Sequence, residues 1–371
     1  MIAVVEVILH RLLMPLQMRV QTSYGVQTDR DLLLVELHTA DGLVGWGESV
    51  AMNHPYYTEE STDTVEVILR RELIPLVLEH PWSHPSEFWQ QASRVIGNPM
   101  AKFAVEGALW DLYAQQQGIS LAQALGGTKA MVEVGVSIGI CPIGELLAEV
   151  GDYLEQGYRR IKIKVQPGWD IEPVTAIRER FPDAPLMVDA NGAYDRADDT
   201  AVLRLDGFGL MMIEQPFAAG SWERHSRLQA QMETPLCLDE SITTLDAALR
   251  AIRLGACRII NVKPGRLGGF TPTLEVVRAA RAGGALLWCG GMYETGVGRA
   301  GCVAMSALDV FTLPGDTAAS RRYFQPDIIR PEVTVVDGQI RVPSLPGLGF
   351  EVDVEQVARY ETEKWTFVAG G

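Results

Sequence analysis

The chain has 371 residues, of which 47% are hydrophobic and 21% charged, and its formal net charge is −15. This length suits one large domain or two domains with separate cores, and the composition is that of an ordinary soluble globular protein. The acidic balance argues against nucleic-acid binding, which usually shows a basic footprint, and no apolar stretch approaches the length of a membrane helix.

The first part of the chain, residues 1–125, mixes strand patterns with helix patterns. Apolar alternation indicates strands and a hairpin, and a 3.6-residue period indicates helices further on. Strands are expected at Val4–Leu13, at Asp31–Thr39 and from Val44, and helices at Ser61–Leu78 and Lys102–Gln117. We therefore expect residues 1–125 to form an α+β module.

The middle of the chain has a period, because apolar strands recur roughly every 25 residues with helical stretches between them. The strands are expected to end at Ile140, Val165, Val188, Ile213, Leu238, Val262, Trp288 and Leu313. Helices are expected at Ile143–Gln156, Glu172–Arg180, Thr243–Leu254 and Thr273–Ala282. Eight parallel strands alternating with helices suit a closed barrel better than an open sheet. The predicted fold class is therefore α/β, with a (β/α)8-type TIM barrel at residues 126–322.

Short strands resume after residue 323, at Glu332–Val336 and Gln339–Val342. We expect this C-terminal segment to pack back on the first module, so that residues 1–125 and 323–371 together form a capping domain. The chain has no linker rich in Pro, Gly or Ser, which predicts that cap and barrel form one rigid unit.

Lysine is rare in this chain, since it accounts for six of the 32 basic residues. Three of the six, Lys162, Lys164 and Lys263, lie in segments that otherwise read as buried strands. Arginine stays charged at any working pH, whereas a partly desolvated lysine can serve as a base. The pattern indicates proton-transfer catalysis, although a lysine at a strand end is more often a surface residue with a buried stem.

Acidic residues follow three successive predicted strands, at the end where barrel enzymes gather their reactive groups. They are Asp189, Glu214 and Asp239. Each of them alone could equally be the N-cap of the next helix. Three convergent carboxylates would repel one another without a cation, and an all-oxygen set without His or Cys favours Mg²⁺.

The strand order places the lysines around these acids. Lys162 and Lys164 are two residues apart and share the inner face of the second strand. The sixth strand, which leads to Lys263, lies opposite the second in a ring of eight. Lys164 and Lys263 should then flank a carboxylate substrate whose α-proton is acidified by the cation. We expect the Lys162 ammonium and the cation to lower the pKa of Lys164, so that it can act as the base.

Two other interpretations remain open. Gly290-Gly291 follows the seventh strand, where barrels often bind phosphate, although no basic residue lies in residues 290–297. A protein that kept the barrel only to bind a carboxylate or a metal would need the same groups without catalysing a reaction.

At these residues the chain resembles the enolase superfamily, in its muconate-lactonising subgroup. The shared pattern is the Lys-x-Lys strand, the Asp/Glu/Asp set and the opposed lysine. Longer motifs, at residues 168–170, 263–269, 288–292 and 313–316, are similar to those of the o-succinylbenzoate synthase/N-acylamino acid racemase family. The resemblance covers nearly the whole chain and implies a modified (β/α)7β barrel with a cap.

The resemblance also implies roles for the residues. It makes Asp189, Glu214 and Asp239 ligands of Mg²⁺, for which Mn²⁺ or another divalent cation could substitute. Lys164 would be the principal base and Lys162 would steady the substrate carboxylate. The implied reaction is the syn-dehydration of 2-succinyl-6-hydroxy-2,4-cyclohexadiene-1-carboxylate in menaquinone biosynthesis, with Lys263 only lying over the ring, and N-succinylamino acid racemisation is expected as a further activity. The alternative is a dedicated N-succinylamino acid racemase, which would use both Lys164 and Lys263 as bases.

Substrate selection in such proteins involves the cap and the late barrel loops. Arg266 is typical of members that racemise, and Tyr293 stands where an aliphatic side chain is expected, so that its phenol could narrow the pocket. The candidate substrate-binding residues are Ser137, Asn191, Arg266, Gly291, Met292, Tyr293, Tyr56 and Tyr323, with the loop 21–25 and Met52 beside them. The eighth strand lacks the Asp-x-Asp with which dipeptide epimerases hold an α-ammonium.

The cysteines and the N-terminus indicate where the protein works. The five cysteines are odd in number, are widely spaced and form no Cys-x-x-Cys motif, which suggests buried thiols of a reducing compartment. Residues 1–6 lack the pattern of a signal peptide. We therefore expect a cytoplasmic enzyme that acts on a small-molecule carboxylate, without nucleic-acid or membrane partners, and that associates into a homo-oligomer.

Overall fold

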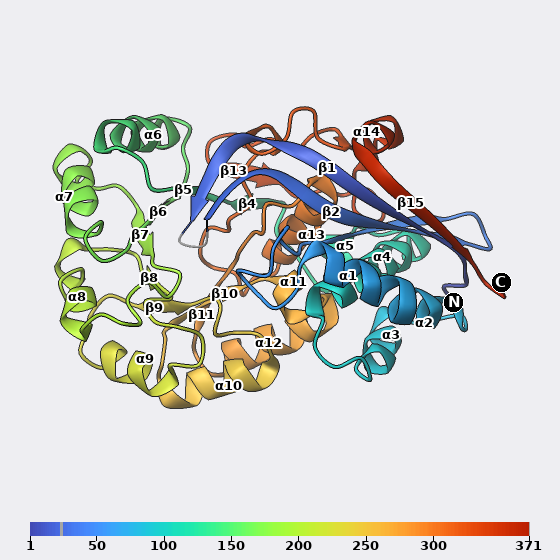
Figure 1. Cartoon of the computed structure of the whole chain (residues 1–371), viewed down its shortest axis with the longest axis horizontal. Coiled ribbons are helices and arrows are strands. Elements are labelled where there is room, and N and C mark those ends of the chain that lie inside the picture. Colours follow the sequence, from blue (N-terminus) through green and yellow to red (C-terminus); the bar gives the residue numbers. More distant parts are fainter. Residues whose placement is uncertain (23–24, 371) are drawn as a thin grey trace.

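The computed structural model describes residues 1–22 and 25–370, with the backbone alone for residues 19–22, 25 and 26. It has two parts, an antiparallel sheet with its helices and a ring of parallel strands surrounded by helices (Figure 1). No helix of the described residues is long and apolar enough to cross a membrane.

The antiparallel sheet combines the start of the chain with its end. Its strands, in the order β15-β1-β2-β3, are Glu361–Val368, Val4–Thr22, Gly25–Thr39 and Val44–Ser49. Glu6 pairs with Val368, so the two ends of the chain lie side by side (Figure 1). The sequence analysis did not predict β15, although its two aromatic residues, Trp365 and Phe367, alternate with polar, exposed ones as in a strand.

Five helices pack against this sheet and against one another. They are α1 (Thr62–Ile68), α2 (Ile74–Leu78), α3 (Pro85–Ala92), α4 (Pro99–Gln117) and α5 (Leu121–Leu125). The predicted helix over 61–78 is present, but a π-helical turn at Leu69–Leu73 divides it. The central helix α4 lies so close to β3 that a β-carbon at Gly47 would collide with the carbonyl oxygen of Ala104.

The parallel strands follow one another in chain order, as the period predicts. The seven strands are β5 (Gly135–Ile138), β6 (Arg160–Lys164), β7 (Leu186–Asp189), β8 (Ile213–Glu214), β9 (Leu236–Leu238), β10 (Ile259–Val262) and β11 (Leu286–Cys289). The helices between and after them are α6 (Ile143–Glu155), α7 (Ile171–Arg180), α8 (Asp199–Leu203), α9 (Trp222–Gln229), α10 (Leu245–Leu254), α11 (Pro264–Leu267), α12 (Phe270–Ala282) and α13 (Gly296–Ser306). All four predicted barrel helices are present.

The ring closes without a full eighth strand in the described part of the chain. The predicted strand ending at Leu313 contributes a single parallel bridge, from Phe311 to Leu287, and Gly315 makes another to Val134. Pro314 has no N–H for a ladder hydrogen bond, which is the physical reason why the segment stays short. These two bridges lie on either side of the gap between β11 and β5, so the fold is a (β/α)7β-type barrel with a cap.

The chain after residue 323 divides between the two parts. β15 joins the capping sheet, whereas β13 (Gln339–Arg341) pairs with β4 (Met131–Glu133) at the start of the barrel. The segment Glu332–Val336 does not form the predicted strand, and two short strands, β12 (Ile329–Arg330) and β14 (Glu351–Val352), pair with each other instead. The last helix is α14 (Val354–Tyr360). The domain limits of 1–125, 126–322 and 323–371 stay predictions.

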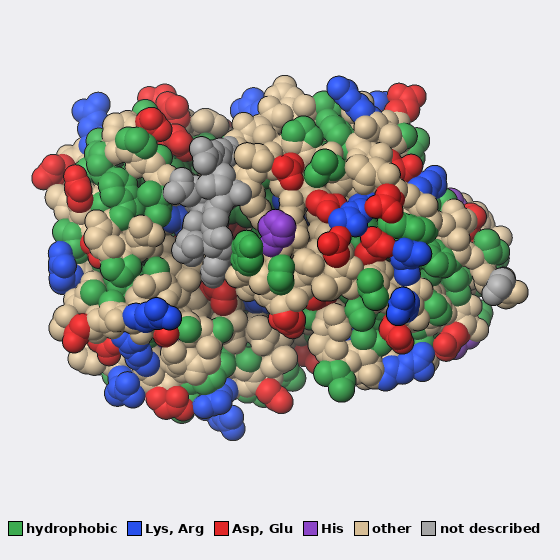
Figure 2. Space-filling view, viewed as in Figure 1, with side chains coloured by type: hydrophobic (Ala, Val, Ile, Leu, Met, Phe, Trp, Pro, Cys, Tyr) green, Lys and Arg blue, Asp and Glu red, His purple; other side chains and the backbone are tan. Residues whose placement is uncertain are grey.

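Charges of opposite sign are mixed on the surface. Figure 2 shows acidic and basic side chains interspersed over the described surface of this face. Arg11 is an example, since its guanidinium contacts Asp31, Asp63 and Glu66. The negative net charge therefore does not gather in one patch on this side of the molecule.

Candidate active site

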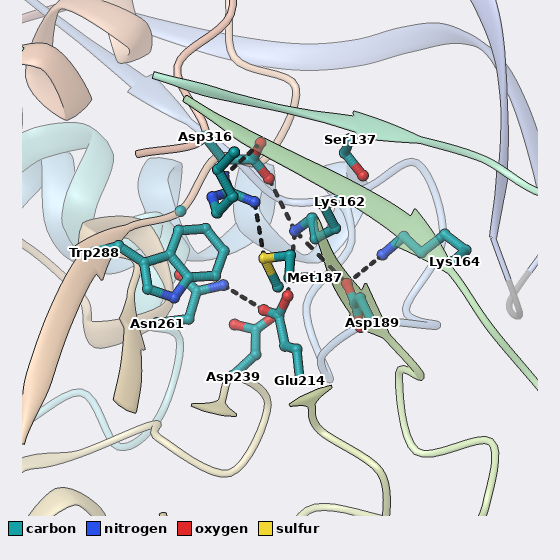
Figure 3. Close-up of polar contacts among 12 residues, drawn as sticks. Ser137, Lys162, Lys164, Met187, Asp189, Glu214, Asp239, Asn261, Trp288 and Asp316 are labelled. Atoms are coloured by element: carbon teal, nitrogen blue, oxygen red, sulfur yellow. Dashed lines mark hydrogen bonds and ion pairs between the residues drawn. The ribbon is translucent and has the colours of Figure 1, made fainter. Parts of the chain in front are cut away.

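The carboxyl ends of the barrel strands carry the charged groups that the sequence singled out, and Figure 3 shows all of them except Lys263. They face a cavity of about 220 Å³, and its wall includes Lys162, Lys164, Asp189, Asp239 and Lys263. A separate apolar cluster formed by side chains of the same strands includes Met187, Met212, Cys237, Ile259 and Trp288. Successive side chains on a strand point to opposite faces, so every second side chain points into the barrel. This alternation directs both the apolar cluster and the charged groups inward.

Lys164 ends β6 and lies directly opposite Asp189 in the ladder with β7. Its Nζ donates to Asp189 Oδ2 at 2.6 Å and to Asn191 Oδ1 at 2.7 Å. Burial alone would lower the pKa of this ammonium, but Asp189, together with Tyr293 and Glu214, raises it. The sequence predicted a lowered pKa for Lys164. The protein groups around Lys164 raise this pKa instead, because the Asp189 carboxylate acts on it more strongly than the Lys162 ammonium does.

Lys162 lies two residues before Lys164 on β6 and is almost fully buried. Its Nζ is 3.3 Å from Glu214 Oε2 and 3.6 Å from Asp189 Oδ2. A third carboxylate, Asp316 Oδ2, lies at 2.9 Å (Figure 3). Although burial opposes it, this set of acids, with Asp316 foremost, raises the pKa of Lys162 well above its ordinary value.

Lys263 stands on the other side of the ring, directly after β10. Three strands, β7, β8 and β9, separate β10 from β6 in the sheet, as the sequence predicted for opposed lysines. The Lys263 ammonium donates to Asp239 Oδ2 at 2.8 Å and to the Tyr57 hydroxyl at 3.0 Å. Burial favours a lower pKa for Lys263, but Asp239 raises it. Lys164 and Lys263 thus reach one cavity from opposite walls.

The three predicted metal ligands are all buried, with 0–1% of their surfaces exposed. Burial, and then the neighbouring charge of Asp189, raise the pKa of Glu214 to about 8. Asp239 behaves differently, because Lys263 and Arg266 overcome burial and lower its pKa to about 2. No group of three or more His, Cys, Asp or Glu side chains in the described chain is arranged around a single metal position. Each acid instead faces an ammonium.

Seven of the eight predicted substrate-binding residues line the cavity. They are Ser137, Asn191, Gly291, Met292, Tyr293, Tyr56 and Tyr323. The eighth, Arg266, lies behind the wall with only 1% of its surface exposed, and its guanidinium contacts Asp239 and the Tyr57 hydroxyl. Met52 also lines the cavity, whereas the side chains of loop 21–25 lie outside the described residues.

The late loops form a rigid aromatic edge of the cavity. Tyr293 has a positive φ of 59°, which is uncommon for a residue with a β-carbon, and its ring meets Tyr323 edge to face at 5.5 Å. Burial raises the pKa of Tyr323 to about 12. A β-carbon at Gly290 would collide with Asn261, so this glycine allows the loop to pass over the end of β10. The Gly290-Gly291 pair therefore has a packing role.

Sequence reasoning missed several residues at the site. Tyr57 enters the cavity and reaches Lys263, while the predicted Tyr56 is 62% exposed. Nothing in the loop pattern distinguishes these two neighbours. Asn261 donates to Glu214 Oε1 at 2.7 Å, and its place two residues before Lys263, on the same strand face, could have identified it. Asp316 follows the eighth predicted strand, so the rule used for the other acids applied to it too.

Two buried glutamates of the capping part hold the barrel loops. Glu48 on β3 accepts hydrogen bonds from the backbone N–H groups of Thr295 and Gly298, at the start of α13. Glu106 on α4 accepts from those of Phe270 and Thr271, at the start of α12. These bonds fix the loops that follow β11 and β10 relative to the cap.

The chain is similar to known proteins over nearly its whole length. Residues 3–126 match the mandelate racemase/muconate lactonizing enzyme N-terminal domain, and residues 145–357 match the enolase C-terminal domain-like family. An o-succinylbenzoate synthase of Geobacillus kaustophilus is 50% identical, over 95% of both chains. An N-succinylamino acid racemase of an Amycolatopsis species is 46% identical, over 92% of this chain and 93% of the other. A solved enolase-superfamily protein from Listeria innocua is 38% identical and superposes over 100% of both chains with a TM-score of 0.96.

Proposed function

The chain belongs to the mandelate racemase/muconate lactonizing enzyme family of the enolase superfamily, and on that premise we propose that it is a Mg²⁺-dependent o-succinylbenzoate synthase with N-succinylamino acid racemase activity. The observation that carries the proposal is the pair of lysines on opposite strands of one cavity, with three buried acids between them. Relatives that share 44–51% of the sequence bear the names of these two activities.

The acids fit a hard divalent cation by their chemistry. All the donors of Asp189, Glu214 and Asp239 are oxygens, and their mutual repulsion helps to raise the pKa of Glu214 to about 8. A divalent cation bound to them would acidify the α-proton of a substrate carboxylate. Asp189 and Asp239, which now hold the ammonium groups of Lys164 and Lys263, would then have another partner, and the two lysines would become available.

Lys164 is positioned to remove the α-proton. As the amine loses Asp189 as its counter-ion, burial and the Lys162 ammonium lower its pKa and favour the neutral, basic form. Its lone pair takes the proton from the α-carbon, the C–O bond to the β-hydroxyl breaks, and the same proton leaves with the hydroxide as water. Asn191, 2.7 Å from the amine, keeps the amine oriented, and Lys162 binds the substrate carboxylate.

Racemisation uses the same groups in a symmetric way. One lysine removes the α-proton and the other delivers a proton to the opposite face. The alternative, a dedicated N-acylamino acid or N-succinylamino acid racemase, is favoured by one observation: Lys263 is as deeply placed in the cavity as Lys164 and has Tyr57 and Arg266 beside it. Dehydration alone would leave Lys263 merely a cation above the ring.

The proposal extends to the setting of the enzyme. Four of the five cysteines are buried free thiols and Cys141 is partly buried, which supports a reducing, cytoplasmic location. We further propose that the substrate is a small-molecule carboxylate and that the enzyme works as a homo-oligomer.

The test is a comparison of kcat/KM for both reactions on one preparation supplied with Mg²⁺. Lys164→Ala should lower both values by at least about a thousandfold, because it removes the proposed base. Lys364→Ala, which removes an exposed lysine on β15, is the matched control and should leave both values unchanged. Undiminished dehydration by the Lys164 variant would contradict the assignment. Exchange of the α-proton of either N-succinylamino acid enantiomer in deuterated water reports the racemase activity separately.

A further inference from the structure

Asp316 lies in the segment that closes the barrel, and neither opposed lysine touches it. Its backbone N–H donates to the carbonyl of Cys289 at the end of β11 at 2.8 Å. The preceding Gly315 accepts from the N–H of Gly135 at the start of β5 at 2.7 Å. The Asp316 side chain forms part of the cavity wall (Figure 3). Backbone contacts with both neighbouring strands therefore hold this carboxylate in place.

Each oxygen of Asp316 faces a different cation. Oδ2 is 2.9 Å from Lys162 Nζ, and Oδ1 is 3.2 Å from Arg160 Nη2. The guanidinium of Arg160 is itself completely buried and lies 4.4 Å from the centre of the Trp288 ring. Although burial opposes it, Lys162 and Arg160 hold the pKa of Asp316 well below its usual range. Asp316 therefore pairs with two cations inside the barrel.

Lys162 has more carboxylate partners than one ammonium needs. Two of them, Glu214 at 3.3 Å and Asp189 at 3.6 Å, belong to the proposed cation site, and Asp316 is the nearest of the three. A divalent cation would draw the charge of Glu214 and Asp189 to itself. A buried ammonium is costly unless a counter-ion stays beside it. Asp316 is the neighbour that the cation would not engage.

We propose that Asp316 is a positioning residue: it is the counter-ion that retains the Lys162 ammonium when a divalent cation occupies Asp189 and Glu214. This role rests on the proposed cation site. It has two consequences. Asp316 makes cation binding easier, because Lys162 can give up its other two partners. It also keeps the Lys162 ammonium in place, where the substrate carboxylate would bind.

The experiment measures the affinity for Mn²⁺, by the loss of its free-ion spin-resonance signal, in the absence of substrate. Asp316→Asn should raise the Kd for Mn²⁺ about tenfold or more, because Lys162 must then compete with the ion for Glu214 and Asp189. Glu294→Gln is the matched control, since it removes one negative charge from the wall of the same cavity without touching Lys162, and it should change Kd less than threefold. Equal effects of the two variants overturn the proposal.

A double-variant cycle separates this role from a general structural one. In a Lys162→Gln background no ammonium competes, so adding Asp316→Asn should leave the Kd for Mn²⁺ within threefold of Lys162→Gln alone. A further tenfold weakening there overturns the proposal. If Asp316→Asn fails to fold, this neutral pair still tests it, because the pair buries no unpaired ammonium. Wild-type protein that binds no Mn²⁺ would overturn the cation site and the counter-ion together, whereas an unchanged Kd in Asp316→Asn overturns the counter-ion alone.

Discussion

Two sets of buried or largely buried carboxylates in this molecule are held in different ways. In the barrel, Asp189, Glu214, Asp239 and Asp316 face ammonium and guanidinium groups. In the capping part, Glu48, Glu60 and Glu106 face backbone N–H groups at the starts of α13, α4 and α12. Side-chain cations can exchange one carboxylate for another, or for a ligand, whereas a helix terminus cannot move away. Burial of an acid therefore does not reveal its role, and the group it faces does.

The pKa values follow the same division. Burial raises the pKa of Glu48, Glu60 and Glu106 to about 7, because the partial charge of a helix N-terminus compensates only part of the lost hydration. The full charges of Lys263 and Arg266 overcome burial at Asp239 and lower its pKa to about 2. We thus expect substitutions in the barrel set to affect chemistry first, and those in the capping set to affect stability first.

The largest expected effect lies in the barrel, at Lys263. Lys263→Ala should lower racemisation by at least about a thousandfold, because one of two required bases is gone, but should lower dehydration only about ten- to a hundredfold. Steady-state kcat/KM for both reactions checks this split. Equal losses would show that Lys263 serves dehydration as more than a cation over the ring.

The second effect lies in the cap. Glu106→Ala should lower the free energy of unfolding by about 2–4 kcal/mol, because it leaves the backbone N–H groups of Phe270 and Thr271 without their acceptor and removes one of the two acceptors of the Trp110 ring N–H. Glu179→Ala, at an exposed position of α7, should change it by less than about 0.5 kcal/mol. Urea unfolding measures both. A Glu106 variant as stable as the control would remove the distinction between the two sets.

The third effect is a dependence of stability on pH. The folded pKa of Glu106 is about 7 against an ordinary value of 4.5, so the folded chain binds this proton more tightly than the unfolded chain does. The contribution of Glu106 to the free energy of unfolding is fully present below pH 4.5. It is lost as pH rises through 7, by up to about 3 kcal/mol. Asp239 acts in the opposite sense, since its contribution is lost as pH falls from about 4 towards 2. Unfolding at pH 5 and pH 8 should show a smaller decrease in Glu106→Gln than in the wild type, and identical decreases would refute the assignment.

The smallest effect is expected where the two regions meet, at Tyr57. Tyr57→Phe removes the hydroxyl that Lys263 and Arg266 contact but keeps the ring 4.7 Å from the Lys263 ammonium. We expect kcat/KM to fall about three- to tenfold, the effect of one lost hydrogen bond. Tyr360→Phe on α14 is the matched control. A loss as large as that of Lys263→Ala would mean that the cap supplies chemistry as well as walls.

The sequence by itself determined the ring and its charged end. A recurring strand pattern fixes which side chains point inward, so Lys162, Lys164, Asp189, Glu214 and Asp239 could be placed from local periodicity alone. The opposition of Lys263 followed from counting strands. Each of these inferences needs only the chain near the residue and the regularity of the barrel.

The tertiary structure decided what depends on contacts between distant segments. It brought the Tyr57 hydroxyl to Lys263 and left Tyr56 largely exposed, drew Arg266 behind Asp239, and added β15 to the edge of the first sheet. It also placed a cationic side chain beside each carboxylate oxygen of Asp316. The reason is physical: a loop takes its course from the surface it packs on, and a β-carbon at Gly265 would already collide with Val50 of the cap. No local pattern carries that information.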